Sequence, residues 1–173
     1  MVKKALPSSH GFTLIELVVV IVILGILAAT AAPKFLNLSD SAKVATLSSI
    51  KGTMQSTIKL VQAKAHIQGL VATSTNPGSG QSAYIIDYGN SSSEIDFRNL
   101  CPESQAELGS AMTMLDFLDL DLTSNLSAQT NNQYTLIGYD IPGFSVPTNQ
   151  GCYIIYDSFG DPECTVTVVD VDC

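Results

Sequence analysis

A nearly continuous apolar stretch close to the N-terminus constrains this sequence more than any other feature. It runs from Phe12 to Ala32, behind a short leader that carries Lys3 and Lys4. As an α-helix rising about 1.5 Å per residue, the stretch would be about 31 Å long, enough to cross the hydrocarbon core of a bilayer. The two lysines favour the cytoplasmic side for the leader. The sequence therefore predicts a helix that inserts into a membrane.

Two ordinary interpretations of this stretch leave one residue unexplained. A secretory signal peptide fits the basic leader and the small residues at Ala28–Ala32, although the stretch is longer than a usual signal core. A plain single-span anchor fits the length. Neither gives a reason for Glu16, because a carboxylate in hydrocarbon costs several kcal/mol unless it is neutralised or paired. Glu16 therefore points to a specific partner.

The residues around Glu16 carry a resemblance to a known family. The segment Gly11-Phe12-Thr13-Leu14-Ile15-Glu16-Leu17, followed by aliphatic residues, resembles the class III signal of type IV pilins and the related pseudopilins. The resemblance implies that a membrane-embedded aspartyl prepilin peptidase removes residues 1–11 by cutting between Gly11 and Phe12. It also implies that the new amine of Phe12 is methylated, and that residues 12–33 form a transmembrane and polymerisation helix.

The resemblance also implies a role for Glu16 in assembly. After cleavage, Phe12 would carry a cationic α-amine, and the Glu16 carboxylate could pair with the Phe12 amine of a neighbouring subunit. Both charges are costly in a bilayer when alone, so pairing offsets part of that cost. The helix dipole also favours a carboxylate at this end, but only by up to about 1 kcal/mol. Pairing is the stronger effect and would set the subunit register.

Gly25 and Pro33 bracket a stretch in which the helix is intrinsically weak. Glycine costs about 1 kcal/mol relative to alanine inside a helix. Proline lacks an amide hydrogen and clashes with the carbonyl four residues earlier. Similar pilins melt between matching positions when packed in a filament. For Gly25–Pro33 this remains one hypothesis, and a simple kink is the other.

The next segment, residues 34–72, has an amphipathic pattern. Six apolar residues recur at steps of three and four, and Lys43, Lys51, Lys59 and Gln62 lie largely off that face. The six are Leu47, Ile50, Met54, Ile58, Val61 and Ala65. The pattern predicts the second half of a long spine helix that docks on a β-sheet. Gly69 and the run Thr73–Gly80 would end the helix.

Residues 73–173 would form a globular head with a small antiparallel sheet, which makes the fold α+β. Ala83–Tyr88 is a candidate short strand, followed by a turn at Asn90–Ser93, and Pro102–Leu118 is predicted to be a second, short helix. The better strand candidates are Tyr134–Tyr139, Cys152–Asp157 and Cys164–Val171. A turn-rich loop, residues 158–163, joins the last two, which predicts a hairpin.

All four cysteines lie in the C-terminal part of the chain. An even number behind an export-type N-terminus predicts two disulfides in an oxidising compartment, with free thiols as the alternative. In an antiparallel hairpin, Cys152 would lie near Cys173, and Cys164 would lie at the opposite, loop end. Of the three connectivities that four cysteines allow, this favours Cys152–Cys173 with Cys101–Cys164.

Several functional classes find little support in the sequence. The net charge of −8 argues against nucleic acid as a partner, and loss of the leader lysines would make the product more acidic. No catalytic triad, G-x-S-x-G motif, phosphate loop or metal-ligand cluster is present, so no enzyme activity, cofactor or metal is predicted. Acidic residues that could suggest calcium lack the spacing of an EF-hand loop, and a solvated face is favoured. They are Asp116, Asp119 and Asp121.

The predicted function is that of the major structural subunit of a type IV pilus. The implied partners are identical subunits, the prepilin peptidase and methylase, the inner-membrane assembly machinery and, before assembly, membrane lipid. The subunit would lie in the inner membrane of a Gram-negative cell and then in an extracellular filament. The alternative is a major pseudopilin of a type II secretion system. These proteins tend to be smaller and often bind calcium, for which Asp157, Asp161 and Glu163 could supply oxygens.

A narrower resemblance is carried by Gly11–Leu38, including Pro33-Lys34-Phe35-Leu36-Asn37-Leu38. This segment is most similar to the mannose-sensitive haemagglutinin (MSHA) pilins of marine gammaproteobacteria. The resemblance implies a filament for surface attachment and biofilm formation. It identifies no adhesive ligand, helical symmetry or glycosylation.

Overall fold

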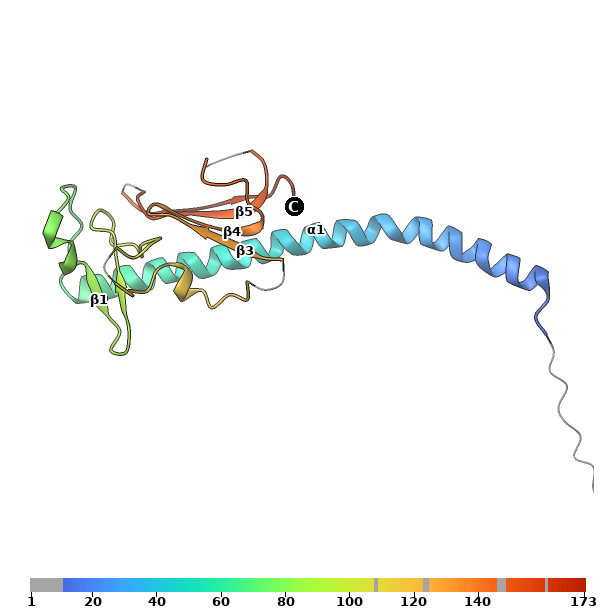
Figure 1. Cartoon of the computed structure of the whole chain (residues 1–173), viewed down its shortest axis with the longest axis horizontal. Coiled ribbons are helices and arrows are strands. Elements are labelled where there is room, and N and C mark those ends of the chain that lie inside the picture. The colour runs from blue at the N-terminus through green and yellow to red at the C-terminus, as the bar shows by residue number, and fades with distance from the viewer. Residues whose placement is uncertain (1–10, 108, 123–124, 146–148, 161) are drawn as a thin grey trace, which may run out of the picture. The chain divides into compact units, whose positions relative to one another are not determined.

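The computed structural model describes residues 11–107, 109–122, 125–145, 149–160 and 162–173. The leader lysines, Lys3 and Lys4, lie outside these residues. The chain divides into two units, one that ends at Asp40 and a second, called here the globular unit, that spans Ser41–Cys173. One long helix, α1 (Leu14–Ile67), begins in the first unit and ends in the second (Figure 1). The fold is α+β, as predicted.

In the globular unit, α1 buries the predicted apolar face. All six side chains of that face are at most 9% exposed: Leu47, Ile50, Met54, Ile58, Val61 and Ala65. Residues three and four positions apart lie on one side of a helix, so this spacing produces one continuous stripe. Gln62 borders the stripe and donates a hydrogen bond to the Asn99 carbonyl at 3.0 Å.

The helix ends at Ile67, a few residues before the predicted end at Ala72. Gly69 has φ of +78°, a left-handed conformation that glycine adopts without steric cost. The Gly69 amide donates to the His66 carbonyl, and the Leu70 amide donates to the Ala65 carbonyl, each at 3.0 Å. This pair of bonds is a Schellman motif, which satisfies carbonyls that the helix end leaves without partners.

A four-stranded antiparallel sheet packs against this half of α1 (Figure 1). The strands lie in chain order: β3 (Ser127–Thr130), β4 (Tyr134–Asp140), β5 (Cys152–Asp157) and β6 (Thr165–Val169). The three strands that the sequence predicts correspond to β4, β5 and β6, and β5 and β6 form the predicted hairpin. β3 was not predicted, because its mostly exposed Ser-Ala-Gln-Thr sequence has no alternating apolar pattern.

The two faces of the sheet bury different clusters. Ile137 and Ile154 pair across β4 and β5 and belong to the same core cluster as Met54 of the α1 stripe. Leu136 and Ile155, the next pair along, belong to a second cluster on the opposite face. Successive side chains on a strand point to opposite faces. The same pairing of β4 with β5 therefore places alternate side chains in the two clusters.

A small hairpin lies near the C-terminal end of α1. It consists of β1 (Ile85–Asp87) and β2 (Ser92–Glu94), which pair antiparallel. β1 lies within the predicted strand, whereas Ser92 and Ser93 are in a strand rather than in the predicted turn. Short 3₁₀ helices are present at Gly78–Ala83 and Leu115–Phe117.

The predicted helix at Pro102–Leu118 is wrong. The described residues of this segment form turns, bridges and the 3₁₀ turn Leu115–Phe117, and Leu108 lies outside the described residues. The Glu103 amide donates to the Glu94 carbonyl, and the Met112 amide donates to the Ser92 carbonyl. Backbone donors that a helix would need are therefore committed to the strand β2.

Two disulfides fix the C-terminal part of the chain. Cys152 pairs with Cys173, and Cys101 pairs with Cys164. These are the two pairs that the hairpin register predicts. The C-terminal residue is held further by Lys43, whose Nζ donates to the Cys173 carbonyl at 2.5 Å. The chain end is thereby tied to α1 as well as to β5.

Candidate assembly site and a polar pocket

The N-terminal end of α1 is closed by hydrogen bonds between Thr13 and Glu16. The amide and the Oγ1 hydroxyl of Thr13 both donate to Glu16 Oε2, at 2.9 and 2.6 Å. In return, the Glu16 amide donates to Thr13 Oγ1 at 3.3 Å. This reciprocal arrangement is a capping box, and an N-cap of this kind contributes about 1 kcal/mol to a helix. Thr13 is thus a functional residue that sequence reasoning missed, although threonine followed by glutamate three residues later is its usual signature.

The cap leaves part of the Glu16 carboxylate available for an intermolecular partner. Both bonds from Thr13 go to Oε2, so Oε1 takes no part in them. The Phe12 nitrogen here belongs to the Gly11–Phe12 peptide bond, so an amine exists only after that bond is cut. Capping within one chain and pairing with the amine of another are therefore geometrically compatible.

The Gly11–Phe12 bond lies just outside the helix. Gly11, Phe12 and Thr13 are not helical, and α1 begins at Leu14. Both residues of the bond are exposed, and Phe12 is 88% exposed. The backbone at the predicted cleavage position is therefore accessible, and no intrahelical hydrogen bond must be broken to reach it.

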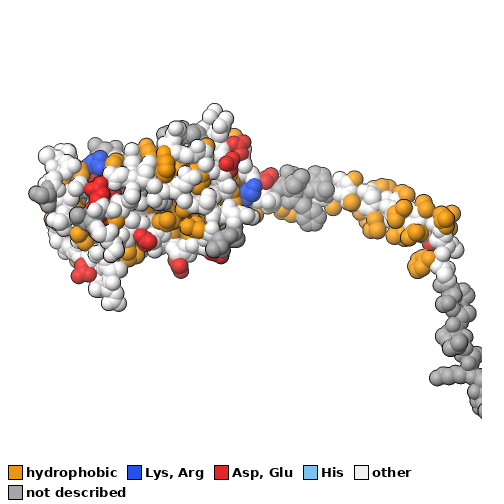
Figure 2. Space-filling view, in the orientation of Figure 1, with side chains coloured by type: hydrophobic (Ala, Val, Ile, Leu, Met, Phe, Trp, Pro, Cys, Tyr) orange, Lys and Arg blue, Asp and Glu red, His pale blue; other side chains and the backbone are white. Residues whose placement is uncertain are grey.

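The apolar part of α1 is long enough to cross a membrane. Leu14–Ala31 contains 18 residues and none of it is buried, a composition and length that signal sequences share. Figure 2 shows hydrophobic side chains covering this end of the helix. The backbone is α-helical through both Gly25 and Pro33, so the isolated chain has no break between them. The hypothesis of melting concerns the packed filament and stays a prediction.

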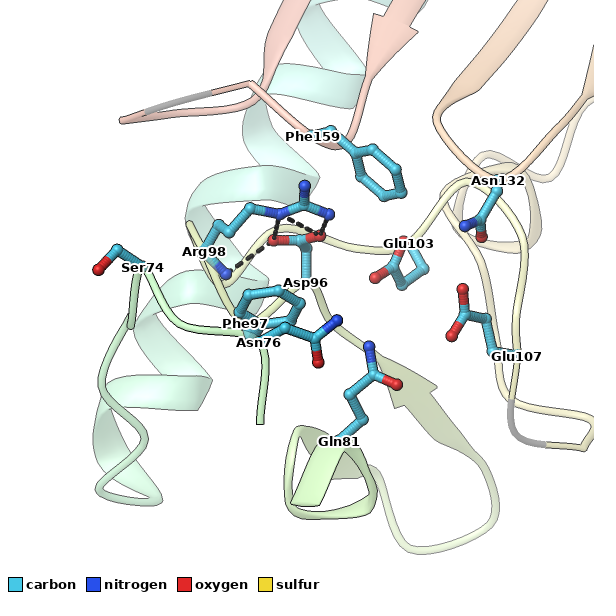
Figure 3. A pocket seen from close by; sticks show the side chains of 10 residues that line it. All are labelled: Ser74, Asn76, Gln81, Asp96, Phe97, Arg98, Glu103, Glu107, Asn132 and Phe159. Carbon is cyan, nitrogen blue, oxygen red and sulfur yellow. Dashed lines mark hydrogen bonds and ion pairs between the residues drawn. The ribbon is translucent and has the colours of Figure 1, made fainter. Parts of the chain in front are cut away.

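A separate polar pocket lies in the globular unit (Figure 3). Its volume is about 400 Å³. The residues that line it come from the segment after α1, from the β2–β3 connection, from the β3–β4 turn and from the β5–β6 loop. They are Ser74, Asn76, Gln81, Asp96, Phe97, Arg98, Glu103, Glu107, Asn132 and Phe159. No sequence motif joins residues so far apart in the chain, so the pocket was not predicted.

One wall of the pocket is an ion pair held between two aromatic rings. Arg98 Nη2 lies 2.7 Å from Asp96 Oδ2, and Arg98 Nε donates to the same carboxylate. The Arg98 guanidinium lies 3.9 Å from the centre of the Phe159 ring and 5.0 Å from that of Phe97. Such bidentate and cation–π contacts fix a guanidinium in one orientation. The positive charge of Arg98 is therefore neutralised within the wall.

The opposite side of the pocket is acidic. Glu103 is 8% exposed, and its Oε2 atom has no hydrogen-bond partner among the described residues. Burial, together with the nearby carboxylates of Asp96, Glu94 and Glu107, raises the pKa of Glu103 to about 8. Figure 3 shows the Glu103 carboxyl group facing the hollow, between the Asp96–Arg98 pair and Glu107.

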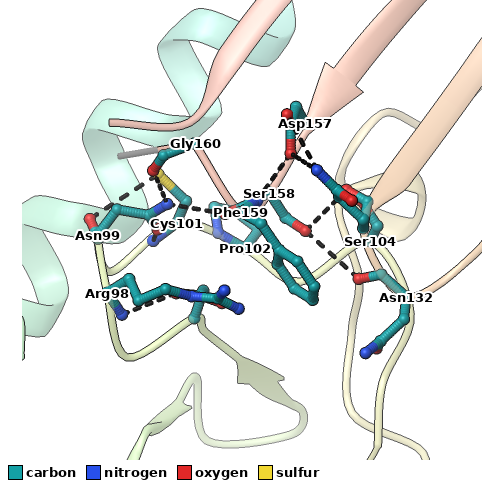
Figure 4. A network of polar contacts seen from close by, with 12 residues as sticks. Arg98, Asn99, Cys101, Pro102, Ser104, Asn132, Asp157, Ser158, Phe159 and Gly160 are labelled. Carbon is teal, nitrogen blue, oxygen red and sulfur yellow. Dashed lines mark hydrogen bonds and ion pairs between the residues drawn. The ribbon is translucent and has the colours of Figure 1, made fainter. Parts of the chain in front are cut away.

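A network of hydrogen bonds holds the loop that carries Phe159 (Figure 4). The side-chain nitrogen Nδ2 of Asn99 donates to the carbonyls of Ser158 and Gly160, each at 2.7 Å. The Asn99 side-chain oxygen accepts from the amide of Cys101, whose disulfide to Cys164 closes the same region. The pocket wall is thus cross-linked by covalent and polar bonds, which favours a preformed site.

The residues considered for calcium do not form a metal site in the described structure. The Asp157 carboxylate accepts from the Phe159 amide at 3.0 Å and from the Gln133 side chain at 3.1 Å. Asp161 lies outside the described residues, and Glu163 is exposed. Asp116 accepts from the amide and hydroxyl of Thr113. In the described part of the chain, no three or more His, Cys, Asp or Glu side chains are grouped to hold a metal ion.

Comparison with known proteins gives two matches. Residues 6–32 match the family model for the prokaryotic N-terminal methylation motif. The chain is also similar to the type IV narrow pilus major component PilA5 of Thermus thermophilus, with 48% identity over 58 residues. That alignment covers 32% of this chain and 50% of the relative, so the chain spans half the length of that protein. No solved structure shows a significant match. The two matches support a type IV pilin.

Proposed function

We propose that this chain is the precursor of a type IV pilus subunit. A prepilin peptidase cuts it between Gly11 and Phe12, and the new Phe12 amine is methylated. The observation that carries the proposal is the geometry at the start of α1. An accessible, non-helical Gly11–Phe12 bond lies one turn before the Glu16 carboxylate, within a segment that matches a methylation motif.

Assembly follows from the charges that cleavage creates. Each processed subunit carries a cationic Phe12 amine and an anionic Glu16 at the end of an apolar helix. Glu16 is held by Thr13 through Oε2, and Oε1 accepts from the Phe12 amine of a neighbouring subunit. Pairing two charges that are both costly in hydrocarbon favours the register in which they meet. The membrane thus stores subunits whose α1 helices later form the core of a filament.

The subunit has different locations and partners before and after assembly. Before assembly the subunit lies in the inner membrane of a Gram-negative cell, in contact with lipid, the prepilin peptidase and methylase, and the assembly machinery. Afterwards it contacts identical subunits in an extracellular filament. The two disulfides suit the oxidising compartment that the globular unit reaches.

A major pseudopilin of a type II secretion system is the second candidate, because it has the same N-terminal chemistry. The similarity to a pilus major component favours the pilus. Electron microscopy of material sheared from cells discriminates between the two. Long filaments that contain this chain support the pilus subunit. Their absence from cells that process and export the chain would favour the pseudopilin.

We further propose that the filament acts in surface attachment and biofilm formation, as an MSHA-type pilus. The support is the similarity of the segment Gly11–Leu38, including the sequence from Pro33 to Leu38, to that group. The test is agglutination of erythrocytes by purified filaments in the presence and absence of mannose. Agglutination that mannose abolishes supports this finer assignment. Filaments that do not agglutinate, or do so regardless of mannose, contradict it while leaving the pilus subunit unaffected.

A further inference from the structure

The polar pocket of the globular unit has features of a binding site that filament assembly does not require. Its volume of about 400 Å³ lies within the usual range for small-molecule sites. Its wall is fixed by the Asn99 bonds and the Cys101–Cys164 disulfide. A buried carboxyl oxygen without a partner is costly, and Glu103 Oε2 is such an atom among the described residues. A ligand that donates a hydrogen bond to Glu103 would remove that cost.

The charge of the pocket selects a cation. Asp96 and Arg98 neutralise each other, which leaves the carboxylates of Glu103 and Glu107 on the opposite side, with Glu94 behind them. Glu94 Oε2 already accepts from the Glu107 amide at 2.7 Å, which positions the Glu107 backbone beside the pocket. An anionic ligand would be repelled by this side. A neutral ligand would form no ion pair with either carboxyl group.

The remaining geometry distinguishes between kinds of cation. A metal ion needs several converging carboxylates, and the described residues contain no group of three or more that could hold one. A quaternary ammonium needs open aromatic faces, but the Arg98 guanidinium already stacks on Phe159. A primary ammonium has three hydrogen-bond donors and fits two carboxylates with an amide oxygen. Asn132 and Gln81 present side-chain amides at the rim (Figure 3).

We propose that this pocket binds a small ligand through a primary ammonium group, with Glu103 and Glu107 as its anionic partners. The ammonium could belong to a free amine or to a lysine side chain of a neighbouring subunit. Because Glu103 is largely protonated at pH 7, binding expels its proton and strengthens as the pH rises toward 8. Charged groups that act on Glu103 are Asp96, Glu94, Glu107 and Arg98.

The test uses the full chain in neutral detergent with n-butylamine as the probe. Carbon-13 NMR of the glutamate carboxyl groups reports which of them respond, and calorimetry gives the affinity. We expect the Glu103 signal to shift and its pKa to fall when butylamine binds. Glu103→Gln should weaken binding about tenfold or more, the loss expected for one charge-assisted hydrogen bond. Glu163→Gln is the matched control, because Glu163 is exposed and does not line the pocket, and it should leave the affinity unchanged.

Further binding measurements distinguish the two sources of the ammonium group and test whether the pocket prefers a primary ammonium to other cations. If butylamine binds both the detergent-solubilised chain and intact filaments, the ligand is a free amine. If it binds only the solubilised chain, a lysine of a neighbouring subunit fills the pocket in the filament. The proposal is overturned if butylamine does not bind, if Glu103→Gln binds it as tightly as the control, or if tetramethylammonium binds equally well. It is also overturned if calcium displaces butylamine through Glu103.

Discussion

At the scale of single residues, the Glu16 carboxylate has one partner within the chain and a second, proposed partner on another chain. Thr13 holds Oε2 within the chain, while the proposed partner of Oε1 lies on another chain. From the sequence, Glu16 could be recognised as a charge that needs a partner, but the intrachain cap was overlooked. The cap matters for experiments, because removal of the whole side chain destroys both interactions at once.

A pair of substitutions separates the two roles of Glu16. Glu16→Gln retains a side-chain oxygen that can accept the Thr13 bonds but removes the charge. Glu16→Ala removes both. Because pairing with the Phe12 amine requires the charge, we expect neither variant to form filaments, although both are cut and inserted into the membrane. The measurement is the amount of sheared filament compared with processed subunit in membranes. Normal filament formation by Glu16→Gln would show that capping, not pairing, is what assembly needs.

Glu103 predicts a dependence of stability on pH. Its pKa of about 8 in the folded chain exceeds the usual value of 4.5, so the folded chain retains a proton that the unfolded chain has lost. This contribution to stability is fully present below pH 4.5 and is lost as the pH rises toward 8. Glu103→Gln cannot ionise, so at pH 8 it should be more stable than the wild type, by on the order of 4 kcal/mol.

Denaturant unfolding of the full chain in neutral detergent, followed by circular dichroism at several pH values, measures this difference. The gap between wild type and Glu103→Gln should widen between pH 4.5 and 8. The Glu163→Gln control should follow the wild type. Parallel curves for the wild type and Glu103→Gln would contradict the account of this residue.

At the scale of elements, α1 has a weak stretch between Gly25 and Pro33 that is nevertheless helical in the isolated chain. We predict that packing in the filament extends this stretch. Gly25→Ala combined with Pro33→Ala should keep it helical, because the two substitutions remove the residues that weaken a helix most. Electron cryomicroscopy of both filaments would show the difference. A continuous helix through Gly25–Pro33 in wild-type filaments would contradict the hypothesis and leave a simple kink.

The two disulfides predict an order of stabilities. Cys101–Cys164 closes a loop with a sequence separation of 63, and Cys152–Cys173 one of 21. Removal of a native disulfide costs about 2–5 kcal/mol, and the longer loop should cost roughly 1 kcal/mol more in the chain-entropy description. Double Cys→Ala variants of each pair, unfolded side by side with denaturant, test this. A larger loss for the Cys152–Cys173 pair would contradict a purely entropic origin.

The elements show why only part of the fold could be predicted. The α1 stripe and strands β4 to β6 follow from periodicity, because each buries one regular set of apolar side chains. The apolar residues of Pro102–Leu118 have helix-like spacing, yet backbone amides of this segment donate to carbonyls of β2. Such bonds to a separate strand cannot be recognised from a local sequence pattern. The pocket is missed for the same reason, since Asp96, Glu103 and Phe159 meet only through tertiary structure.

At the scale of the whole molecule, the chain combines two parts with opposite solvent preferences. Leu14–Ala31 is apolar and exposed, whereas Ser41–Cys173 is a folded unit with its own core and two disulfides. A protein with such an exposed apolar helix needs lipid or other subunits to cover it. The apolar stretch could be recognised from the sequence, because it is set by composition alone and needs no tertiary information.

The intact mass of the subunit from extracellular filaments tests the central claim most directly. The account predicts the mass of residues 12–173 with one added methyl group, less the hydrogens lost in two disulfides. Fragmentation should place the methyl group on the amine of Phe12. A subunit that retains residues 1–11, or one that begins after the small residues near Ala32, would contradict cleavage at Gly11–Phe12 and with it the proposed mode of assembly.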